Sequence, residues 1–342
     1  MTWRRVTQKL SKPFSNLTKL ERFLQALRVG SACLAIFFSL MVLVGPAVNN
    51  RLYMTRINCA HLDVSYGLYN SLRSSVSLAP TIFGDNDSKN QPMGNSLTNS
   101  EIKLLSDYAE AQVAGAPQYC TSSLWSWCYG NYESYQTVDK SGREVTKTRN
   151  EVLTCSKRRD YAFDYRSQLE EMGLQSILAY AYQSQVSKST QYSESVASRN
   201  HRSSLAMNGI VFSCCAQLML LASALIIYAN RGLERDLSKI PNVVLHALAV
   251  LSLIACLSSI ISSSLITNLV IITRNEVASK LKDFGVSFSR GYTWFTLLWL
   301  TTVCCIITMA SWALPLWCAN PPPEPKYKTD DSILIGKYTQ YF

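Results

Sequence analysis

Four long apolar stretches without a charged residue divide this chain into unequal parts. They are Val29–Val48, Ser203–Asn230, Ile240–Thr273 and Gly291–Pro323. Each is long enough to cross the hydrocarbon core of a bilayer, which takes about 20 apolar residues in a helix. Residues 49–202 separate the first two stretches, whereas the other gaps are short. The pattern predicts a four-helix membrane bundle with one large loop, and it excludes a soluble enzyme.

The charges predict how this bundle is oriented. Seven basic residues and one acid precede Val29, namely Arg4, Arg5, Lys9, Lys12, Lys19, Arg22 and Arg28, with Glu21. Lys and Arg gather on the cytosolic side of membrane proteins, so we expect a cytosolic N-terminus. Crossings at 29–48, 203–230, 240–273 and 291–320 then place 49–202 and 274–290 outside, and 231–239 and 321–342 in the cytosol. The second outer loop, with four basic residues against three in the inner one, weakly opposes this orientation.

The net charge of +10 does not predict a nucleic-acid partner, because the basic residues are spread over loops and concentrated at the N-terminus. Ser15–Arg28 places leucines and Phe23 on one helical face, with basic residues elsewhere. Such a segment, within residues 1–28, suits the anionic lipids of the cytoplasmic leaflet. A plain positive flank of the first crossing explains it equally well. Cys33 and Cys318 lie near cytosolic helix ends and are candidate palmitoylation sites.

The other cysteines of interest, Cys59, Cys120, Cys128 and Cys155, all lie in the large loop. An even number in an extracellular segment predicts two disulfides. Zinc is the alternative, but the loop has no CxxC pair. The residues between Cys128 and Cys155 favour strands at their flanks and a turn at Asp139–Gly142. A hairpin folded there brings Cys128 opposite Cys155, which leaves Cys59 to pair with Cys120.

The remainder of the loop predicts a small extracellular α+β domain. Asn86 begins an Asn-Asp-Ser sequon for N-glycosylation in a polar stretch. Helical spacing predicts a helix over Ser100–Val113, and a mostly helical period over Ser167–Ser198 predicts another that leads into the second crossing. Aromatic residues are frequent between Tyr66 and Tyr135. They favour either a partner-binding patch or internal packing.

The membrane helices and the loops offer little for catalysis or transport. No Asp, Glu, Lys or Arg lies within the four stretches, whereas pumps and ion-coupled transporters use such residues. The chain has three histidines and none of the common hydrolase, phosphate-loop or HExxH motifs. We therefore expect no enzyme activity, cofactor or metal. Small residues four apart, such as Ala255, Ser259 and Ser263, predict close helix packing within the bundle.

The large loop carries a resemblance to the claudin superfamily. Leu124, Trp125 and Cys128 match the L-W-x-x-C part of its first-loop signature, although Ser123 stands where the signature has Gly. The wide spacing to Cys155 and the long loop are more similar to the fungal members, the PalI and eisosome-associated group. The run from Cys155 to Asp164 is similar to the C…(Y/F)-x-F-(D/N) segment of that group.

This resemblance implies an accessory role without chemistry. The superfamily includes γ subunits of voltage-gated calcium channels, and the cysteine-bearing loop is most similar to the claudin-like component of the fungal high-affinity calcium influx system. It implies a plasma-membrane protein that docks beside a calcium channel pore protein and contacts that protein or its extracellular regulatory subunit. The alternative is a cortical scaffold that organises membrane domains and cell-wall synthesis.

Overall fold

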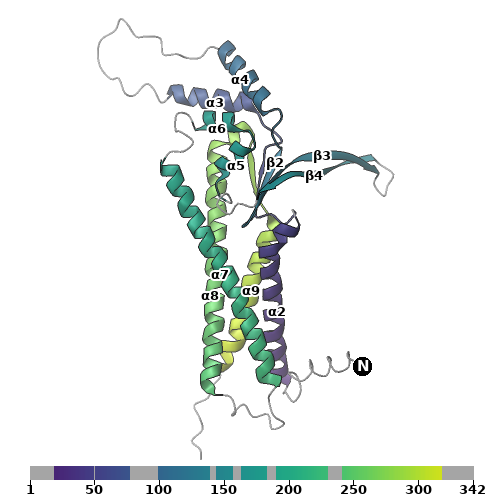
Figure 1. The fold of residues 1–342 in the computed structure, drawn as a ribbon, viewed down its shortest axis with the longest axis vertical. Coiled ribbons are helices and arrows are strands. Elements are labelled where there is room, and N and C mark those ends of the chain that lie inside the picture. Colours follow the sequence, from purple (N-terminus) through teal and green to yellow (C-terminus); the bar gives the residue numbers. More distant parts are fainter. Residues whose placement is uncertain are drawn as a thin grey trace, which may run out of the picture.

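The computed structural model describes residues 19–49, 51–77, 99–138, 144–156, 163–182, 190–229 and 241–317. Four helices form an upright bundle, and a mixed domain sits on one end of it (Figure 1). The helices are α2 (Lys19–Val48), α7 (Thr190–Ala229), α8 (Asn242–Lys280) and α9 (Tyr292–Trp317). All four are long and apolar enough to cross a membrane. The predicted multi-pass architecture with a large α+β domain is confirmed.

Two of the helices extend well beyond the bilayer. Helices α7 and α8 have 40 and 39 residues. At 1.5 Å per residue each is about 60 Å long, twice the thickness of the hydrocarbon core. Their outer ends therefore stand in the mixed domain, hereafter the outer domain, as Figure 1 shows. The predicted loop 274–290 is in fact largely the end of α8, a 3-10 turn η4 (Lys282–Phe284) and a strand.

The outer domain contains one antiparallel sheet in the order β4-β3-β2-β1-β5. Its strands are β1 (Thr55–Asn58), β2 (Tyr119–Ser122), β3 (Trp127–Val138), β4 (Glu144–Ser156) and β5 (Ser287–Arg290). Strand β5 comes from the second outer loop and pairs with β1, with Ile57 opposite Phe288. The expectation that the first loop alone builds this domain is therefore wrong. Four residues are too short to show the alternation that identifies a strand.

Short helices cover the sheet on the side away from the membrane. They are α3 (Val64–Ser77), α4 (Asn99–Val113), α5 (Tyr165–Glu171) and α6 (Gln175–Ala181). Helix α4 confirms the prediction for Ser100–Val113. The single helix expected over Ser167–Ser198 is wrong, because α5 ends at Glu171, two residues before Gly173, whose φ of 85° is left-handed. There the N–H of Leu174 donates to the carbonyl of Leu169 at 2.9 Å, a bond that closes a helix end.

Buried side chains form one cluster in the outer domain and another at its boundary with the bundle. The first includes Ile57, Trp127 and Leu169, together with Val277 and Phe284 from the second outer loop.

Within the bundle, serine residues of α8 pack against the neighbouring helices, as the spacing of Ala255, Ser259 and Ser263 predicts. Ser258 donates to the carbonyl of Gly209 on α7, and the Ser259 and Ser263 hydroxyls are 3.1 and 2.8 Å from that of Thr302 on α9.

Helices α2 and α9 are joined near the outer domain by what we call the outer clasp. Pro46 lies inside α2 and has no N–H, so the carbonyl of Val42, four residues earlier, loses its helical donor. The indole Nε1 of Trp294 on α9 donates to this carbonyl at 3.1 Å. Trp294 is fully buried. The contact satisfies a backbone group that lipid cannot hydrogen-bond.

An inner clasp joins the same helices at the opposite end, with the roles exchanged. Pro315 lies inside α9 and frees the carbonyl of Ser311. Arg28 on α2 donates to that carbonyl from Nε at 2.9 Å and from Nη2 at 2.7 Å. Arg28 belongs to the predicted N-terminal basic segment, and its side chain is buried between the helices.

Candidate docking site

A two-stranded ribbon projects sideways from the outer domain, away from its other strands and helices (Figure 1). Strand β2 pairs with β3 only as far as Gly130, so beyond that residue β3 pairs with β4 alone. We call residues 131–138 and 144–152 the hairpin arm. Because β4 is the last strand of the sheet, its outer edge has no strand neighbour among the described residues. Such an edge is a template for another chain.

A disulfide closes the base of the hairpin arm. Cys128 lies directly opposite Cys155 in the register of β3 and β4, and their sulfur atoms are bonded. The pairing of β3 and β4 continues to Val138 opposite Glu144, and the turn predicted at Asp139–Gly142 lies outside the described residues. The Cys128–Cys155 bond follows the pairing that the sequence predicts. A free two-stranded hairpin is marginally stable in water, so this crosslink matters to the arm.

We expect Cys128→Ser to destabilise the outer domain by about 3 kcal/mol, the loop-closure contribution of a crosslink over this span. The protein should be retained before it reaches the cell surface, and the arm should become sensitive to protease. Surface biotinylation and limited proteolysis of the purified chain measure both effects. Cys215→Ser, at an exposed position of α7, is the matched control. Normal trafficking and protease resistance of the Cys128 variant would contradict a structural role for the bond.

The arm leaves the sheet at a bulge beside Gly130. The register of β3 and β4 shifts between Tyr129 and Gly130. A Cβ on Gly130 would lie 1.9 Å from the carbonyl oxygen of Glu151, so no larger residue fits here. The hydroxyl of Tyr119 donates to that same oxygen at 3.0 Å. Bulges bend a strand and increase its twist, which accounts for the departure of the arm from the sheet.

Arg56 on β1 holds several aromatic rings beneath the arm. Its guanidinium carbon is 4.6, 4.9 and 5.7 Å from the ring centres of Tyr119, Tyr132 and Tyr53. Its Nη2 also donates to Asn150 on β4 at 3.1 Å. Burial raises the pKa of the Tyr119 phenol, so the ring stays neutral. Part of the aromatic content of the loop thus serves packing and fixes the angle of the arm.

The second predicted disulfide is absent, because Cys59 and Cys120 are both free thiols in the structure. Cys120 lies opposite Ile57, whereas the N–H of Cys59 bonds to the carbonyl of Gln118. The two cysteines are thus diagonal neighbours, which are about 7–8 Å apart in a sheet, at or beyond the span of a disulfide. Both thiols are buried in the core of the outer domain. Elimination leaves Cys59 and Cys120 as a pair, but it takes no account of the strand register that sets the distance between them.

We expect Cys59 and Cys120 to resist alkylation in the native protein and to react once it is unfolded without reductant. Burial raises the pKa of the Cys59 thiol to about 12 and also raises that of Cys120, so neither is a thiolate nucleophile near neutral pH. Mass spectrometry after iodoacetamide labelling, with and without denaturant, reports this directly. Recovery of a Cys59–Cys120 linked peptide would restore the pairing predicted from the sequence.

The family motif lies where the sheet meets the bundle. Leu124 and Trp125 occupy the turn between β2 and β3, which is closed by the N–H of Ser123 on the carbonyl of Ser126 at 2.8 Å. Leu124 is buried and Trp125 partly buried, and both pack with Phe163 in the boundary cluster. This cluster also holds Trp294 of the outer clasp. The motif therefore anchors the outer domain to the membrane helices and is not itself a docking surface.

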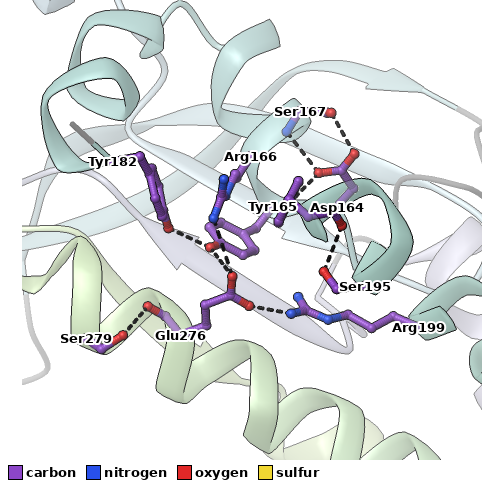
Figure 2. Close-up of polar contacts among 10 residues, drawn as sticks. Asp164, Tyr165, Arg166, Ser167, Tyr182, Ser195, Arg199, Glu276 and Ser279 are labelled. Carbon is purple, nitrogen blue, oxygen red and sulfur yellow. Dashed lines mark hydrogen bonds and ion pairs between the residues drawn. The ribbon is translucent and has the colours of Figure 1, made fainter. Parts of the chain in front are cut away.

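A polar group that we call the junction cluster fixes α5 and α6 to α7 and α8 (Figure 2). Its centre is Glu276 on α8, which forms ion pairs with Arg166 on α5 and Arg199 on α7. The Tyr165 hydroxyl donates to Glu276 at 2.8 Å and lies 2.6 Å from that of Tyr182. Burial raises the pKa of the Tyr165 phenol, which is therefore a neutral donor.

Aromatic rings and a second carboxylate complete the junction cluster. The Arg166 guanidinium lies between the rings of Tyr182 and Tyr192, 3.6 and 3.7 Å from their centres. Asp164 caps α5 by accepting from the N–H of Ser167, and it also accepts from the Tyr192 hydroxyl at 2.7 Å. Two arginines and two carboxylates make the cluster neutral, so its charges can be buried. Its charged residues are far apart in the chain, so no local sequence pattern predicts it.

Other predicted site residues lie elsewhere. Cys33 is exposed on α2, and its acylation stays a prediction. Asn86 and Cys318 lie outside the described residues, so the glycosylation and second acylation sites also stay predictions. Of the aromatic residues in the large loop, Trp127 and Tyr119 are buried, whereas Tyr66, Tyr69 and Tyr135 are exposed. The loop aromatics therefore serve both packing and surface, and Tyr135 lies on the hairpin arm.

Comparisons with known proteins agree with this architecture. The chain is 32% identical to Protein ECM7 of Saccharomyces cerevisiae over 326 residues, which are 94% of this chain and 71% of that protein. No solved structure matches the chain significantly. A family model described as the SUR7/PalI family matches residues 26–311. Its match includes the four crossings, the hairpin arm and the junction cluster, and the chain therefore belongs to the SUR7/PalI family.

Proposed function

We propose that this protein is a non-enzymatic accessory subunit of a plasma-membrane calcium channel, with both termini in the cytosol. The observation that carries the proposal is the hairpin arm, which offers an open strand edge far from the bundle. The junction cluster and the boundary cluster fix the outer domain to the helices. A partner that contacts the arm is thereby tied to the membrane helices, as a subunit that modulates a channel requires.

The membrane helices support a role in assembly. The hydroxyl groups of Ser258, Ser259 and Ser263 on α8 form hydrogen bonds within the bundle. Exposed residues of α8 include the aliphatic side chains of Val250, Ile254 and Leu257. Such a surface suits lateral contact with lipid or with another membrane helix. The resemblance of the loop to the fungal calcium influx component directs the proposal to a calcium channel pore protein and its extracellular regulatory subunit.

Purification of the full chain in mild detergent, with identification of bound proteins, tests this function. We expect a large channel polypeptide to co-purify and calcium uptake to fall when the gene is deleted. Leu153→Ser, at a half-exposed position where β4 enters the arm, should reduce recovery of the channel. Leu104→Ser, on the exposed face of α4, is the matched control. Complexes that never contain a channel chain, together with static patches at the cell cortex, would instead favour the scaffold role.

A further inference from the structure

A cavity of about 220 Å³ opens between the four helices at the end of the bundle opposite the outer domain. All four helices contribute to its wall, with Leu24, Arg28, Ile227, Tyr228, Leu245 and Trp312 among the lining residues. Most of this surface is apolar, and the guanidinium of Arg28 is the one charged group among the described residues that line it. A cavity of this composition suits a ligand that has both an apolar and an anionic part.

The charge of Arg28 has no counter-ion among the described residues. The residue is 8% exposed. Three of its five N–H groups donate to neutral oxygens, two to the Ser311 carbonyl and one to the Tyr228 hydroxyl at 2.6 Å. Its guanidinium carbon lies 4.5 Å from the ring centre of Trp312. These contacts solvate the cation without neutralising it, and an unpaired buried charge is costly near a bilayer.

The depth of Arg28 matches the level of lipid headgroups. Twenty residues of α2 separate it from Val48 at the outer end, which is about 30 Å of helix and equals the thickness of the hydrocarbon core. Gln25, one turn earlier on the same side of α2, is fully buried, and its amide atoms have no partner in the described chain. Arg28 thus has unused hydrogen-bonding capacity in the wall of the cavity, and Gln25 has unused capacity one turn away on α2.

We propose that this cavity binds an anionic phospholipid of the cytoplasmic leaflet. The phosphate accepts from the remaining N–H groups of Arg28, and the first methylenes of an acyl chain lie among Leu24, Ile227 and Leu245. Basic pockets between helices on the cytoplasmic side are a known form of anionic-lipid site, and that leaflet is enriched in anionic lipids. The inference rests on the proposed orientation of the chain and does not depend on the channel role.

Native mass spectrometry of the full chain tests the site. The protein is titrated with palmitoyl-oleoyl phosphatidylserine or with the phosphatidylcholine of the same chains. We expect one retained phosphatidylserine per protein, with a preference of about tenfold, the effect of one charge-assisted hydrogen bond. Leu245→Trp fills the cavity while Arg28 is kept, and it should remove the preference. Val244→Trp, on the exposed side of α8, should keep it.

Variants of Arg28 and competition by inorganic phosphate test the proposed lipid site further. Arg28→Lys keeps the charge and should retain part of the preference, and Arg28→Gln should lose it. If Arg28→Gln fails to fold, Leu245→Trp decides alone. Equal retention of the two lipids, or an unchanged preference in Leu245→Trp, overturns the proposal. Displacement of the lipid by millimolar inorganic phosphate would assign the site to a free anion instead. Loss of channel co-purification with the lipid preference intact would refute only the proposed function.

Discussion

Glu276→Leu should remove a large part of the protein's stability and lower its unfolding temperature. The substitution leaves Arg166 and Arg199 without their shared carboxylate, and it removes the acceptor of the Tyr165 hydroxyl. Breaking a buried ion pair from one side costs about 3–5 kcal/mol, and we expect the lower end because these side chains keep 10–24% exposure. A domain has about 5–15 kcal/mol in all. Thermal unfolding and the fraction at the cell surface measure the loss.

Charge balance makes this prediction specific. With Glu276 replaced, the junction cluster carries two cations and one anion, so a second change, Arg199→Met, restores neutrality. The double variant should therefore be more stable than Glu276→Leu alone. Glu194→Leu, at an exposed position on α7, is the control for loss of a carboxylate and should be close to neutral. If Glu276→Leu unfolds at the wild-type temperature, the cluster does not hold the outer domain to the bundle.

At each clasp, the cost of losing the side chain that bonds to the freed carbonyl should fall when the proline that frees this carbonyl is replaced. Trp294→Phe leaves the Val42 carbonyl unpaired inside the protein, which costs about 1–3 kcal/mol. In a Pro46→Ala background residue 46 again has an N–H for that carbonyl, so the same change should cost much less. Arg28→Leu with and without Pro315→Ala is the equivalent pair at the other end. Unfolding of all variants in detergent gives the two coupling energies, which we expect at about 0.5–3 kcal/mol.

Matched controls separate the effect of losing a clasp hydrogen bond from the effect of losing side-chain size or charge. Trp299→Phe alters an exposed tryptophan on the same helix, and Arg22→Leu removes an exposed arginine of α2. Both should leave stability almost unchanged. Additive effects of Trp294→Phe and Pro46→Ala would mean that the indole stabilises by packing alone, and the outer clasp would then carry no hydrogen-bond energy.

The features that the sequence predicted are those that depend on local composition or on symmetric spacing. Charge-free stretches identify the four crossings, because lipid excludes unpaired charge along each helix separately. The pairing of Cys128 with Cys155 follows from a hairpin that is closed by its own turn residues. Helix α4 is predictable for a similar reason, because its apolar residues recur at helical spacing within one short segment.

The features that were missed depend on residues far apart in the chain. Arg28 and Ser311 are separated by 283 positions, and β5 pairs with a strand more than 200 residues earlier. The error at Cys59 and Cys120 has the same origin, since their register is set by the sheet and not by the chain between them. One signal was available for the clasps: a proline inside an apolar stretch implies a freed carbonyl four residues before it.

The position of β5 has a consequence for the synthesis of the protein. Strand β1 emerges early, yet its outer neighbour is made only after two further helices have entered the membrane, with Arg56 and Ser289 separated by 233 positions. At about 5–20 residues per second this interval lasts at least ten seconds. In the proposed orientation, β1 has an unpaired edge on the lumenal side during that time, and chaperones there can bind it. Pairing of β5 with β1 therefore indicates that the third membrane helix, α8, has been inserted.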